Sequence, residues 1–350
     1  WCDTIFVSEM NAEEKPLPQD AFGRMLKDLR ISVTDRCNMR CVYCMPKDVF
    51  GPDYPYLGRS ELLTYEEIVR LTRVLTGLGV RKVRLTGGEP LLRYDLEHLI
   101  EMLSHIADID LTLTTNGALL TLAKARALKT AGLRRLTVSL DSLDQSVFAH
   151  LNDVDFPVAR VLAGIENAAA AGLSPIKINM VVQRGINESQ ILPIAHYGKS
   201  LGVCTRFIEF MDVGNHNTWL QEKVFAANEI VQVLSEDFDL TPIKSRIPGE
   251  VARRFREKGN GWEIGLISSV TQPFCQDCVR IRLTADGTVY TCLFATTGFD
   301  IKEILRTTSD DEDLFASISG LWGKRSDRYS EVRFDKKVGG EKVEMHYVGG

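Results

Sequence analysis

Residues 29–46 of the chain read Leu29-Arg30-Ile31-Ser32-Val33-Thr34-Asp35-Arg36-Cys37-Asn38-Met39-Arg40-Cys41-Val42-Tyr43-Cys44-Met45-Pro46. The run begins with the alternation typical of a β-strand and then brings three cysteines at C-x3-C-x2-C spacing. Three thiolates on a tight loop can hold three corners of an iron–sulfur cube, because its irons prefer thiolate sulfur. The fourth iron then keeps an open position that can bind a small molecule. We therefore predict a 4Fe-4S cluster on Cys37, Cys41 and Cys44, with an incomplete zinc site or buried structural cysteines as the alternatives.

A repeating pattern follows this motif, in which short β-branched runs alternate with stretches that have apolar residues at helical spacing. Strands are expected at residues 29–34, 81–86, 109–115, 134–140, 175–182 and 204–210. Helices are expected at residues 65–78, 95–106, 122–131, 158–171 and 190–201. Six such units predict an α/β fold with a parallel sheet, an incomplete (β/α)6 barrel of the TIM type. Six strands are too few to close an eight-stranded barrel, so one side is expected to stay open.

The pattern changes near residue 245. Residues 262–269 and 279–293 are expected to form antiparallel strands, with Asp286-Gly287 as a two-residue hairpin turn. This part of the chain is expected to cover the open side of the barrel. We therefore predict a loose N-terminal arm over residues 1–21, a partial barrel over 22–244 and a C-terminal domain over 245–350.

Composition limits the class of protein. The 350 residues are 44% hydrophobic and 25% charged, which suits one large or two modest globular domains. No run approaches the ~18–20 apolar residues of a membrane span, and no signal peptide is visible, so a cytoplasmic protein without a membrane partner is expected. The formal charge of −5 argues against a general nucleic-acid binder. A polyphosphate substrate would then need a local basic pocket.

A second group of cysteines lies in the C-terminal part. Cys275 and Cys278 form a C-x2-C pair, and Cys292 lies on the return strand of the predicted hairpin. Folding of that hairpin is expected to bring Cys292 towards the pair. A zinc knuckle is the main alternative, but the missing fourth ligand favours another cluster with one open iron, which could hold the substrate.

Basic residues recur inside the expected strands. Lys82 and Arg84 alternate with apolar neighbours, so both point to one face of their strand. The other cations of this kind are Arg30, Lys177, Arg206, Arg280 and Arg282. Burial of an unpaired cation is costly, so these residues predict a phosphate site, with internal salt bridges, for example to Glu89 or Glu209, as the alternative.

The second strand ends in Thr86-Gly87-Gly88-Glu89-Pro90. The carboxyl ends of parallel strands carry the sites of β/α folds, and glycines there let a ligand approach the backbone closely. The run is therefore a candidate ligand contact, although a glycine pair before Glu-Pro is also an ordinary turn.

The motif C-x3-C-x-aromatic-C after the first strand of a β/α repeat resembles the radical S-adenosylmethionine (SAM) superfamily. The longer string from Asp28 to Pro46 resembles the branch of that superfamily that cyclises GTP in molybdenum cofactor biosynthesis, and the similarity runs from about Phe22 to the last residue. The resemblance implies that SAM contacts the backbone near Tyr43, Gly88, Ser139 and Met211. It further implies that GTP contacts Arg30, Arg84, Thr114 and Lys177, with Arg280 and Arg282 beside it, and we add Arg206 from its strand position. It implies two 4Fe-4S clusters, on Cys37, Cys41 and Cys44 and on Cys275, Cys278 and Cys292, the second holding the guanine.

The resemblance also implies a reaction. The reduced first cluster splits SAM into methionine and a 5′-deoxyadenosyl radical, which takes hydrogen from the ribose C3′ of GTP so that C3′ joins C8 of guanine. The implied product is (8S)-3′,8-cyclo-7,8-dihydroguanosine 5′-triphosphate. The implied partners are a flavodoxin-like or ferredoxin-like electron donor and the next enzyme of the pathway, and a homodimer is allowed. The chain end, Gly349-Gly350, is expected to reach the active site as it does in that family.

Two other functions fit part of the pattern. A peptide-modifying radical SAM maturase would carry more C-terminal cysteines and an added peptide-binding domain. A non-catalytic iron–sulfur or zinc protein would need no SAM pocket. The sequence departs from the GTP-cyclising relatives at residues 150–155, where the shape of one loop is in doubt.

Overall fold

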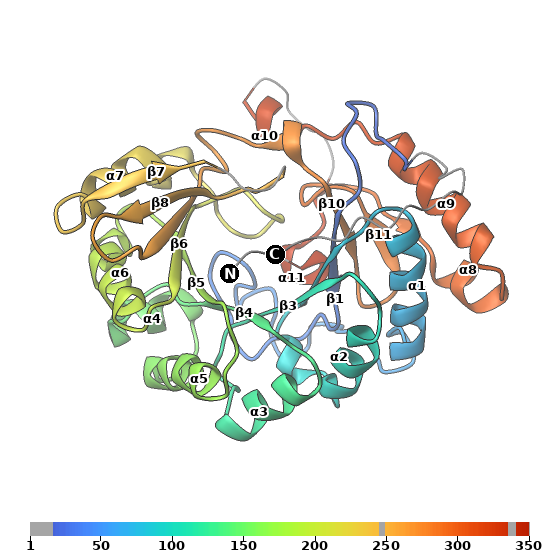
Figure 1. Ribbon diagram of the computed structural model, residues 1–350, viewed down its shortest axis with the longest axis horizontal. Helices are drawn as coiled ribbons and strands as arrows, with labels where there is room; N and C mark the ends of the chain where they lie inside the picture. Colours follow the sequence, from blue (N-terminus) through green and yellow to red (C-terminus); the bar gives the residue numbers. More distant parts are fainter. Residues whose placement is uncertain (1–16, 245–248, 335–340, 350) are drawn as a thin grey trace.

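The computed structural model describes residues 17–244, 249–334 and 341–349 (Figure 1). Its strands are β1 (Asp28–Ser32), β2 (Lys82–Thr86), β3 (Asp110–Thr115), β4 (Arg135–Ser139), β5 (Ile176–Val182), β6 (Cys204–Glu209), β7 (Leu240–Ile243), β8 (Arg253–Glu257), β9 (Glu263–Ile267), β10 (Arg280–Leu283), β11 (Thr288–Tyr290) and β12 (Phe299–Asp300). Its α-helices are α1 (Tyr65–Gly77), α2 (Leu96–Ser104), α3 (Leu122–Thr130), α4 (Gln145–Asn152), α5 (Val158–Ala170), α6 (Ile191–Ser200), α7 (Ala227–Leu234), α8 (Lys302–Thr307), α9 (Asp311–Gly323), α10 (Tyr329–Val332) and α11 (Met345–Val348).

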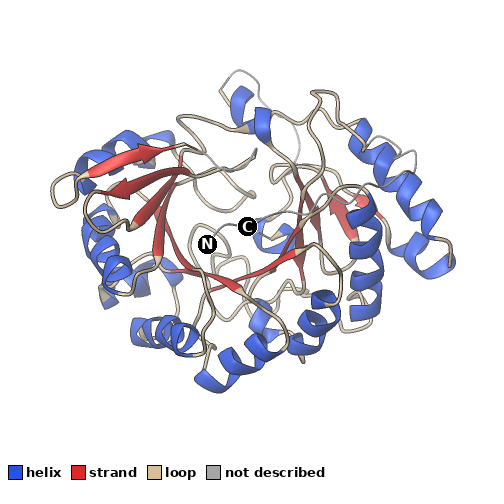
Figure 2. Ribbon diagram, viewed as in Figure 1, coloured by secondary structure: helices blue, strands red, loops and turns tan. Residues whose placement is uncertain are grey.

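Strands β1 to β6 form a parallel sheet in chain order, and the six predicted β/α units are confirmed. Figure 2 shows the strands as a curved layer with most of the helices outside it, whereas α11 lies on the inner side. The main core lies between the sheet and the outer helices α1 to α7, which bury apolar residues there. No helix in the described ranges is long and apolar enough to cross a membrane.

The two edges of this sheet are extended by C-terminal strands. Strand β9 pairs in parallel with β6, and β10 pairs in parallel with β1, so the predicted C-terminal strands lie at opposite ends of one twelve-stranded sheet. Each of these two strands has the expected antiparallel partner on one side only: β9 pairs with β8, and β10 pairs with β11. The physical reason is that an open six-stranded barrel leaves two edges with unpaired backbone groups, which β9 and β10 satisfy. The predicted hairpin is confirmed, but its turn is longer than the two residues expected: Leu283 pairs with Val289 and the Thr284 N–H donates to the Thr288 carbonyl, which leaves residues 285–287 in the loop. Gly287 supplies the positive φ of that loop, at 96°.

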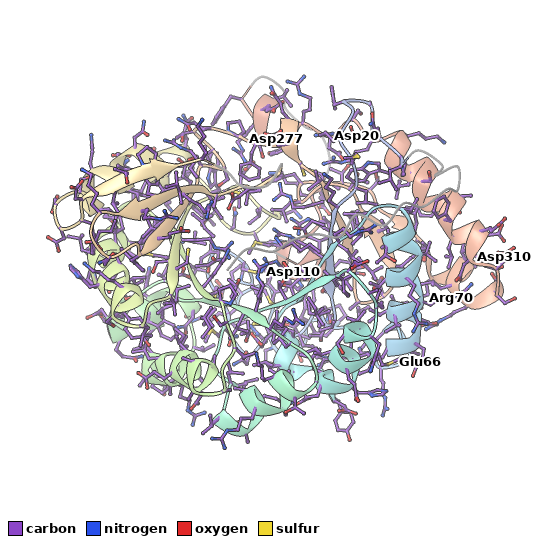
Figure 3. All side chains as sticks on the ribbon, viewed as in Figure 1. Asp20, Glu66, Arg70, Asp110, Asp277 and Asp310 are labelled. Atoms are coloured by element: carbon purple, nitrogen blue, oxygen red, sulfur yellow. The ribbon has the colours of Figure 1, made fainter. Side chains whose placement is uncertain are left out.

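Helix α1 illustrates how local chemistry sets the elements. Its N-cap Thr64 accepts a hydrogen bond from the backbone N–H of Glu67, and the Glu67 carboxylate accepts one from the backbone N–H of Thr64. The helix is joined to the C-terminal segment by Arg70, whose Nε lies 2.8 Å from the Asp311 carboxylate of α9. Figure 3 shows Arg70 beside the N-terminus of α9, labelled at Asp310.

Residues 150–155, where the shape of a loop was in doubt, comprise the last turn of helix α4, its C-cap Asp153 and the two residues after it. The backbone carbonyls of Leu151 and Asn152 accept hydrogen bonds from the N–H groups of Val42 and Arg40, each at 2.9 Å. Asp153 follows in the left-handed conformation, with a φ of 48°. The stretch therefore supports the cysteine loop of residues 37–44 directly.

Glu209 fixes the far edge of the barrel. Its carboxylate is fully buried and accepts hydrogen bonds from the N–H groups of Ala227, Val270 and Thr271 at 2.8–2.9 Å, and from the Thr271 hydroxyl at 2.5 Å. One side chain thereby joins the end of β6, the start of α7 and the loop after β9. Glu209 is thus committed to neutral donors and is not the counter-charge of a buried arginine.

We expect Glu209→Gln to destabilise the protein by about 2 kcal/mol, because the amide that replaces one oxygen cannot accept from the donors there. Urea unfolding of the metal-free protein, followed by circular dichroism, measures the change. The control Glu236→Gln alters an exposed carboxylate at the end of α7 and should leave the midpoint unchanged. Equal midpoints for both variants would contradict this account of Glu209.

Candidate functional site

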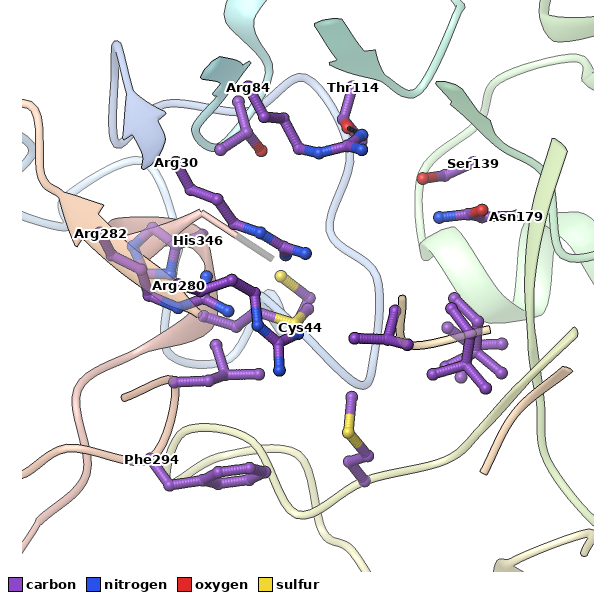
Figure 4. A pocket seen from close by; sticks show the side chains of 18 of the residues that line it. Arg30, Cys44, Arg84, Thr114, Ser139, Asn179, Arg280, Arg282, Phe294 and His346 are labelled. Atoms are coloured by element: carbon purple, nitrogen blue, oxygen red, sulfur yellow. Dashed lines mark hydrogen bonds between the residues drawn. The ribbon is translucent and has the colours of Figure 1, made fainter. Parts of the chain in front are cut away.

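A cavity of about 290 Å³ lies inside the barrel. All of the predicted site residues except Lys177 line this cavity, although they come from distant parts of the chain. They are Arg30, Cys37, Cys41, Tyr43, Cys44, Arg84, Gly88, Thr114, Ser139, Arg206, Met211, Cys275, Cys278, Arg280, Arg282 and Cys292. Figure 4 labels ten of the lining side chains that it draws, with the arginines of β1 and β10 facing Ser139 and Asn179 across the space.

The first cysteine loop is a tight turn held against the end of β2. The carbonyl of Cys41 accepts hydrogen bonds from the N–H groups of Cys44 and Met45, at 2.9 and 2.8 Å. Gly88 packs so closely on this loop that a Cβ there would lie 2.3 Å from the carbonyl oxygen of Arg36. Glycine is therefore required at this position by close approach, and the ordinary-turn alternative accounts for only part of the motif.

The three thiols of this loop suit a positively charged partner. Burial and the charge of Glu89 raise the pKa of Cys37 to about 11, and burial also raises the pKa values of Cys41 and Cys44. Such thiols ionise when a metal replaces the proton. All cysteines in the described ranges are free, and no group of three His, Cys, Asp or Glu side chains there is arranged around a single metal ion. The residue types and their loop fit a cluster with several irons.

Glu89 and Asn116 support this loop, and Asn116 was not predicted from the sequence. The buried Glu89 carboxylate accepts hydrogen bonds from the Thr115 hydroxyl at 2.6 Å and from the N–H groups of Asn116 and Leu91 at 2.7 and 3.0 Å. Asn116 in turn donates to Asn38 at 2.8 Å. Glu89 is therefore a brace between β2 and β3, and the alternative that it neutralises a strand arginine is wrong. Burial raises its pKa to about 7.

Asp141 is a second residue that the sequence analysis missed. It lies just after β4 and lines the cavity, where its carboxylate accepts a hydrogen bond from the Tyr43 hydroxyl at 2.6 Å and from the Val181 N–H at 2.8 Å. Burial raises the pKa of Asp141 to about 6. Its position at the carboxyl end of a parallel strand was the signal that could have identified it.

The second cysteine group lies in a more positive environment. Cys275 begins a short 3-10 helix (Cys275–Asp277), and the Cys278 sulfur accepts hydrogen bonds from Arg280 at 3.4 Å and from Arg325 at 3.1 Å. Although burial alone raises it, the charges of Arg280 and Arg325 bring the pKa of Cys278 down to about 6. Burial and Asp327 raise the pKa of Cys292 to about 12.

Three arginines stand in one row across neighbouring strands. Arg282 on β10 pairs in register with Arg30 on β1, and Arg30 pairs in register with Arg84 on β2. Residues in register on adjacent strands share a face of the sheet, and like charges placed so are destabilising. We call Arg282, Arg30 and Arg84 the arginine row. Its place on the cavity wall predicts that an anion binds there.

The arginine row has no carboxylate partner within 4 Å in the described ranges. Arg84 donates to the hydroxyls of Thr114 and Thr137 at 2.6 and 3.3 Å, and the Nε atoms of Arg30 and Arg84 are buried without a hydrogen-bond acceptor. Burial lowers the pKa of Arg30 to about 9, and burial together with Arg206 lowers that of Arg84 to about 10. The free donors therefore favour a bound anion.

Lys177 lies outside the cavity lining. It is half-buried near the start of β5, two residues before the lining residue Asn179. Burial and the charge of Arg206 lower its pKa to about 8. Arg206 itself donates to Asn179 at 2.8 Å and to Thr137 at 3.2 Å, which holds its guanidinium at the cavity.

The C-terminal segment enters the cavity. Met345 and His346 line it, Val348 is fully buried, and Arg282 donates hydrogen bonds to the carbonyls of Val348 and Gly349. A Cβ on Gly349 would lie 2.2 Å from the Thr86 side chain, so glycine is required there as well. Gly350 lies outside the described residues. Nothing in the composition of the tail signals this placement.

Comparison with known proteins places this geometry in a family. A model of the radical SAM superfamily matches residues 31–198, and a model of the molybdenum cofactor synthesis C-terminal region matches residues 203–331. Among solved structures, SuiB of Streptococcus suis bound to S-adenosylmethionine has a TM-score of 0.60 at 15% identity, over 84% of this chain and 68% of that one. Native anSMEcpe with bound AdoMet has a TM-score of 0.57 at 17% identity, over 91% and 93%. These two likenesses concern the fold.

Similarity to curated proteins is much higher. The GTP 3′,8-cyclase of Acidothermus cellulolyticus is 49% identical over 95% of this chain and 99% of its own length. The GTP 3′,8-cyclase of Staphylococcus saprophyticus is 46% identical over 95% of this chain and 98% of its own. Identity at this level over nearly the full length, together with both domain matches, shows that the chain belongs to the GTP 3′,8-cyclase family of the radical SAM superfamily.

Proposed function

We propose that this protein is an enzyme that converts GTP to (8S)-3′,8-cyclo-7,8-dihydroguanosine 5′-triphosphate, the first step of molybdenum cofactor biosynthesis. The observation that carries the proposal is the arginine row, which stands in the same cavity as two cysteine triplets. A cavity that combines thiol ligands with uncompensated guanidinium groups suits redox cofactors and a polyphosphate substrate together. Family membership names that substrate as GTP.

The first cysteine triplet, Cys37, Cys41 and Cys44, would hold a 4Fe-4S cluster whose open iron takes SAM. When bound, the cluster and SAM supply the 5′-deoxyadenosyl radical that removes hydrogen from C3′ of the ribose. The chain contributes orientation around them. We assign SAM contacts to Tyr43, Gly88, Ser139 and Met211, since all four line the cavity near the carboxyl ends of the strands.

We assign the triphosphate to the arginine row, with Thr114, Arg206 and Arg280 beside it. The Thr114 hydroxyl already orients Arg84 at 2.6 Å. We assign Lys177 to the same phosphates from its place on β5, two residues before the lining residue Asn179. Guanidinium groups held in this way would bind phosphate oxygens without further ordering, which keeps the cost of binding low.

The second triplet, Cys275, Cys278 and Cys292, would hold a second 4Fe-4S cluster that contacts the guanine. Cyclisation consumes two electrons for each GTP, one to split SAM and one to reduce the cyclised sugar–base radical. A flavodoxin-like or ferredoxin-like donor would supply them, and the product would pass to the next enzyme of the pathway. A homodimer stays a prediction, and so does the cytoplasmic location that was expected from the composition of the sequence.

The direct test is anaerobic. The protein is reconstituted with iron and sulfide and given dithionite, SAM and GTP, and 5′-deoxyadenosine and a cyclised guanosine triphosphate are followed by mass spectrometry. We expect both products in equal amounts. Deoxyadenosine without a GTP product would instead favour a maturase acting on another substrate, and neither product from cluster-loaded protein would favour a non-catalytic iron–sulfur protein.

We expect Arg84→Gln to lower kcat/KM for GTP by roughly 10- to 100-fold, because a lost charge-assisted phosphate contact costs about 1.5–3 kcal/mol. The same kinetic assay at varied GTP concentration measures this. The matched control Arg306→Gln removes an arginine that is paired with Glu67 at 2.7 Å on the outer surface, and should change nothing. An Arg84→Gln enzyme with normal kinetics would remove the row from the phosphate site.

We expect replacement of Cys275, Cys278 and Cys292 by alanine to halve the iron content, from about eight to about four irons per chain, while SAM binding at the first triplet persists. Iron assay and equilibrium dialysis with labelled SAM measure the two quantities. Unchanged iron would show that there is no second cluster. The zinc-knuckle alternative would be established if elemental analysis of the unaltered protein found zinc together with only about four irons per chain.

A further inference from the structure

Arg325 contacts the second cysteine triplet from outside the motif. It follows helix α9, and its side chain is only 1% exposed. Its Nη2 donates to the Cys278 sulfur at 3.1 Å, and its Nη1 donates to the Cys278 carbonyl at 2.8 Å. One guanidinium therefore grips both the backbone and the sulfur of a single cysteine.

The surroundings of Arg325 fix this orientation. Its Nη1 also lies 3.0 Å from the Asp20 carboxylate, and its Nε lies 3.2 Å from both the Asp327 carboxylate and the Thr291 carbonyl. Its guanidinium carbon lies 4.6 Å from the centre of the Trp322 ring. These contacts come from different parts of the chain, so the guanidinium has little freedom to turn away from the sulfur.

A second arginine continues the brace. Arg24 shares the Asp20 carboxylate at 2.6 Å and donates to the carbonyls of Cys275 and Asp327 at 2.5 and 3.0 Å. Trp322 donates to the Arg24 carbonyl at 2.9 Å. Figure 3 shows Asp20 and Asp277 near one another at the same end of the molecule. Residues 20–24, near the start of the described chain, and residues 322–327, at and after the end of α9, thus meet around residues 275–278.

The first triplet has no equivalent. The Cys37 sulfur accepts from the Met39 N–H at 3.4 Å and faces the Asn116 amide at 3.9 Å, and both donors are neutral. In the described part of the chain, no arginine nitrogen donates to Cys37, Cys41 or Cys44 sulfur; the nearby Arg40 donates to backbone carbonyls instead. The guanidinium contact therefore distinguishes the second triplet from the first.

Charged donors to ligand sulfur act on a cluster in a known direction. Uptake of one electron makes a cluster more negative, and N–H donors and positive charge at its sulfurs stabilise that reduced form. We propose that Arg325 is a positioning residue that holds Cys278 in place and raises the reduction potential of the second 4Fe-4S cluster. The inference rests on the proposed second cluster. The couple concerned takes one electron from an external low-potential reductant and returns it on oxidation.

The experiment isolates the second cluster in the full-length chain by replacing Cys37, Cys41 and Cys44 with alanine. In this parent, Arg325→Gln, Arg325→Lys and the control Arg328→Gln are compared after anaerobic reconstitution. Arg328 is half-exposed and paired with Glu331 at 2.6 Å, and Glu331 accepts a hydrogen bond from the Gln276 N–H at 3.1 Å. Arg328→Gln therefore removes a nearby arginine that, in the described part of the chain, donates to no cysteine sulfur. Iron content is measured first, and the midpoint potential is then obtained by titration with dithionite and mediators, followed by electron paramagnetic resonance.

We expect Arg325→Gln to reduce the ratio of reduced to oxidised cluster at least tenfold at a given potential, a midpoint about 59 mV lower than in the parent. Arg328→Gln should match the parent. Arg325→Lys keeps a charge but cannot reach the sulfur, the carbonyl and Asp20 together, so its midpoint should fall between the two. If Arg325→Gln binds no iron, the lysine variant decides the question.

The outcomes separate the two proposals. If the parent binds four irons and an Arg325 variant that retains the cluster has the same midpoint potential, the role of Arg325 is overturned. The proposed function then stays intact. A parent that binds no iron overturns the second cluster and the role of Arg325 with it. The inference is established if every Arg325 variant that retains the cluster has a lowered midpoint potential while Arg328→Gln keeps the midpoint of the parent.

Discussion

The interior of this barrel is organised around three arginines that form no salt bridge with any carboxylate of the described residues. Arg282, Arg30 and Arg84 stand in register on three adjacent strands, and their burial lowers the pKa values of all three. An arrangement of this kind opposes folding, because like charges on neighbouring strands repel each other and desolvation of each guanidinium is costly. The protein tolerates it only by leaving the groups exposed to a cavity, where an anionic ligand can replace the missing carboxylates.

The same requirement explains how the C-terminal part of the chain is used. Strand β10 carries Arg282 to the open edge of β1, and strand β9 closes the other edge against β6. These pairings satisfy the backbone groups that an incomplete barrel leaves free, and they bring the second cysteine triplet to the cavity. The tail then places the Val348 and Gly349 carbonyl oxygens on Arg282, where they accept its hydrogen bonds. These oxygens carry partial negative charge at a guanidinium that pairs with no carboxylate of the described residues.

Local patterns were enough to predict the six β/α units, both cysteine motifs and the arginines of the cavity wall, because alternation and spacing act over a few residues. They were wrong for Lys82, which pairs with Asp28 at 3.2 Å, and Lys177 does not line the cavity. The strand partners of β9 and β10 could not be predicted, since they depend on which barrel edges stay open. Asp141, Asn116 and Arg325 were missed for a related reason. Each gains its importance from contacts between distant parts of the chain, such as Tyr43 with Asp141, Asn38 with Asn116 and Cys278 with Arg325. Of the three, Asp141 alone carried a signal, its place at the carboxyl end of β4. Glu89 and Glu209 do not pair with the strand cations, because both carboxylates accept hydrogen bonds from backbone N–H groups instead.

The two cysteine triplets therefore lie in one cavity but in different electrostatic surroundings. Cys37 faces neutral donors, whereas Cys278 accepts from two guanidinium groups. Arg280 belongs to both systems, because it donates to Cys278 and shares strand β10 with Arg282 of the arginine row. A polyphosphate bound to the row would draw on the same positive potential that favours the Cys278 thiolate. Negative charge on the second triplet would therefore weaken polyphosphate binding. By linkage, bound polyphosphate would disfavour negative charge on the triplet by the same free energy.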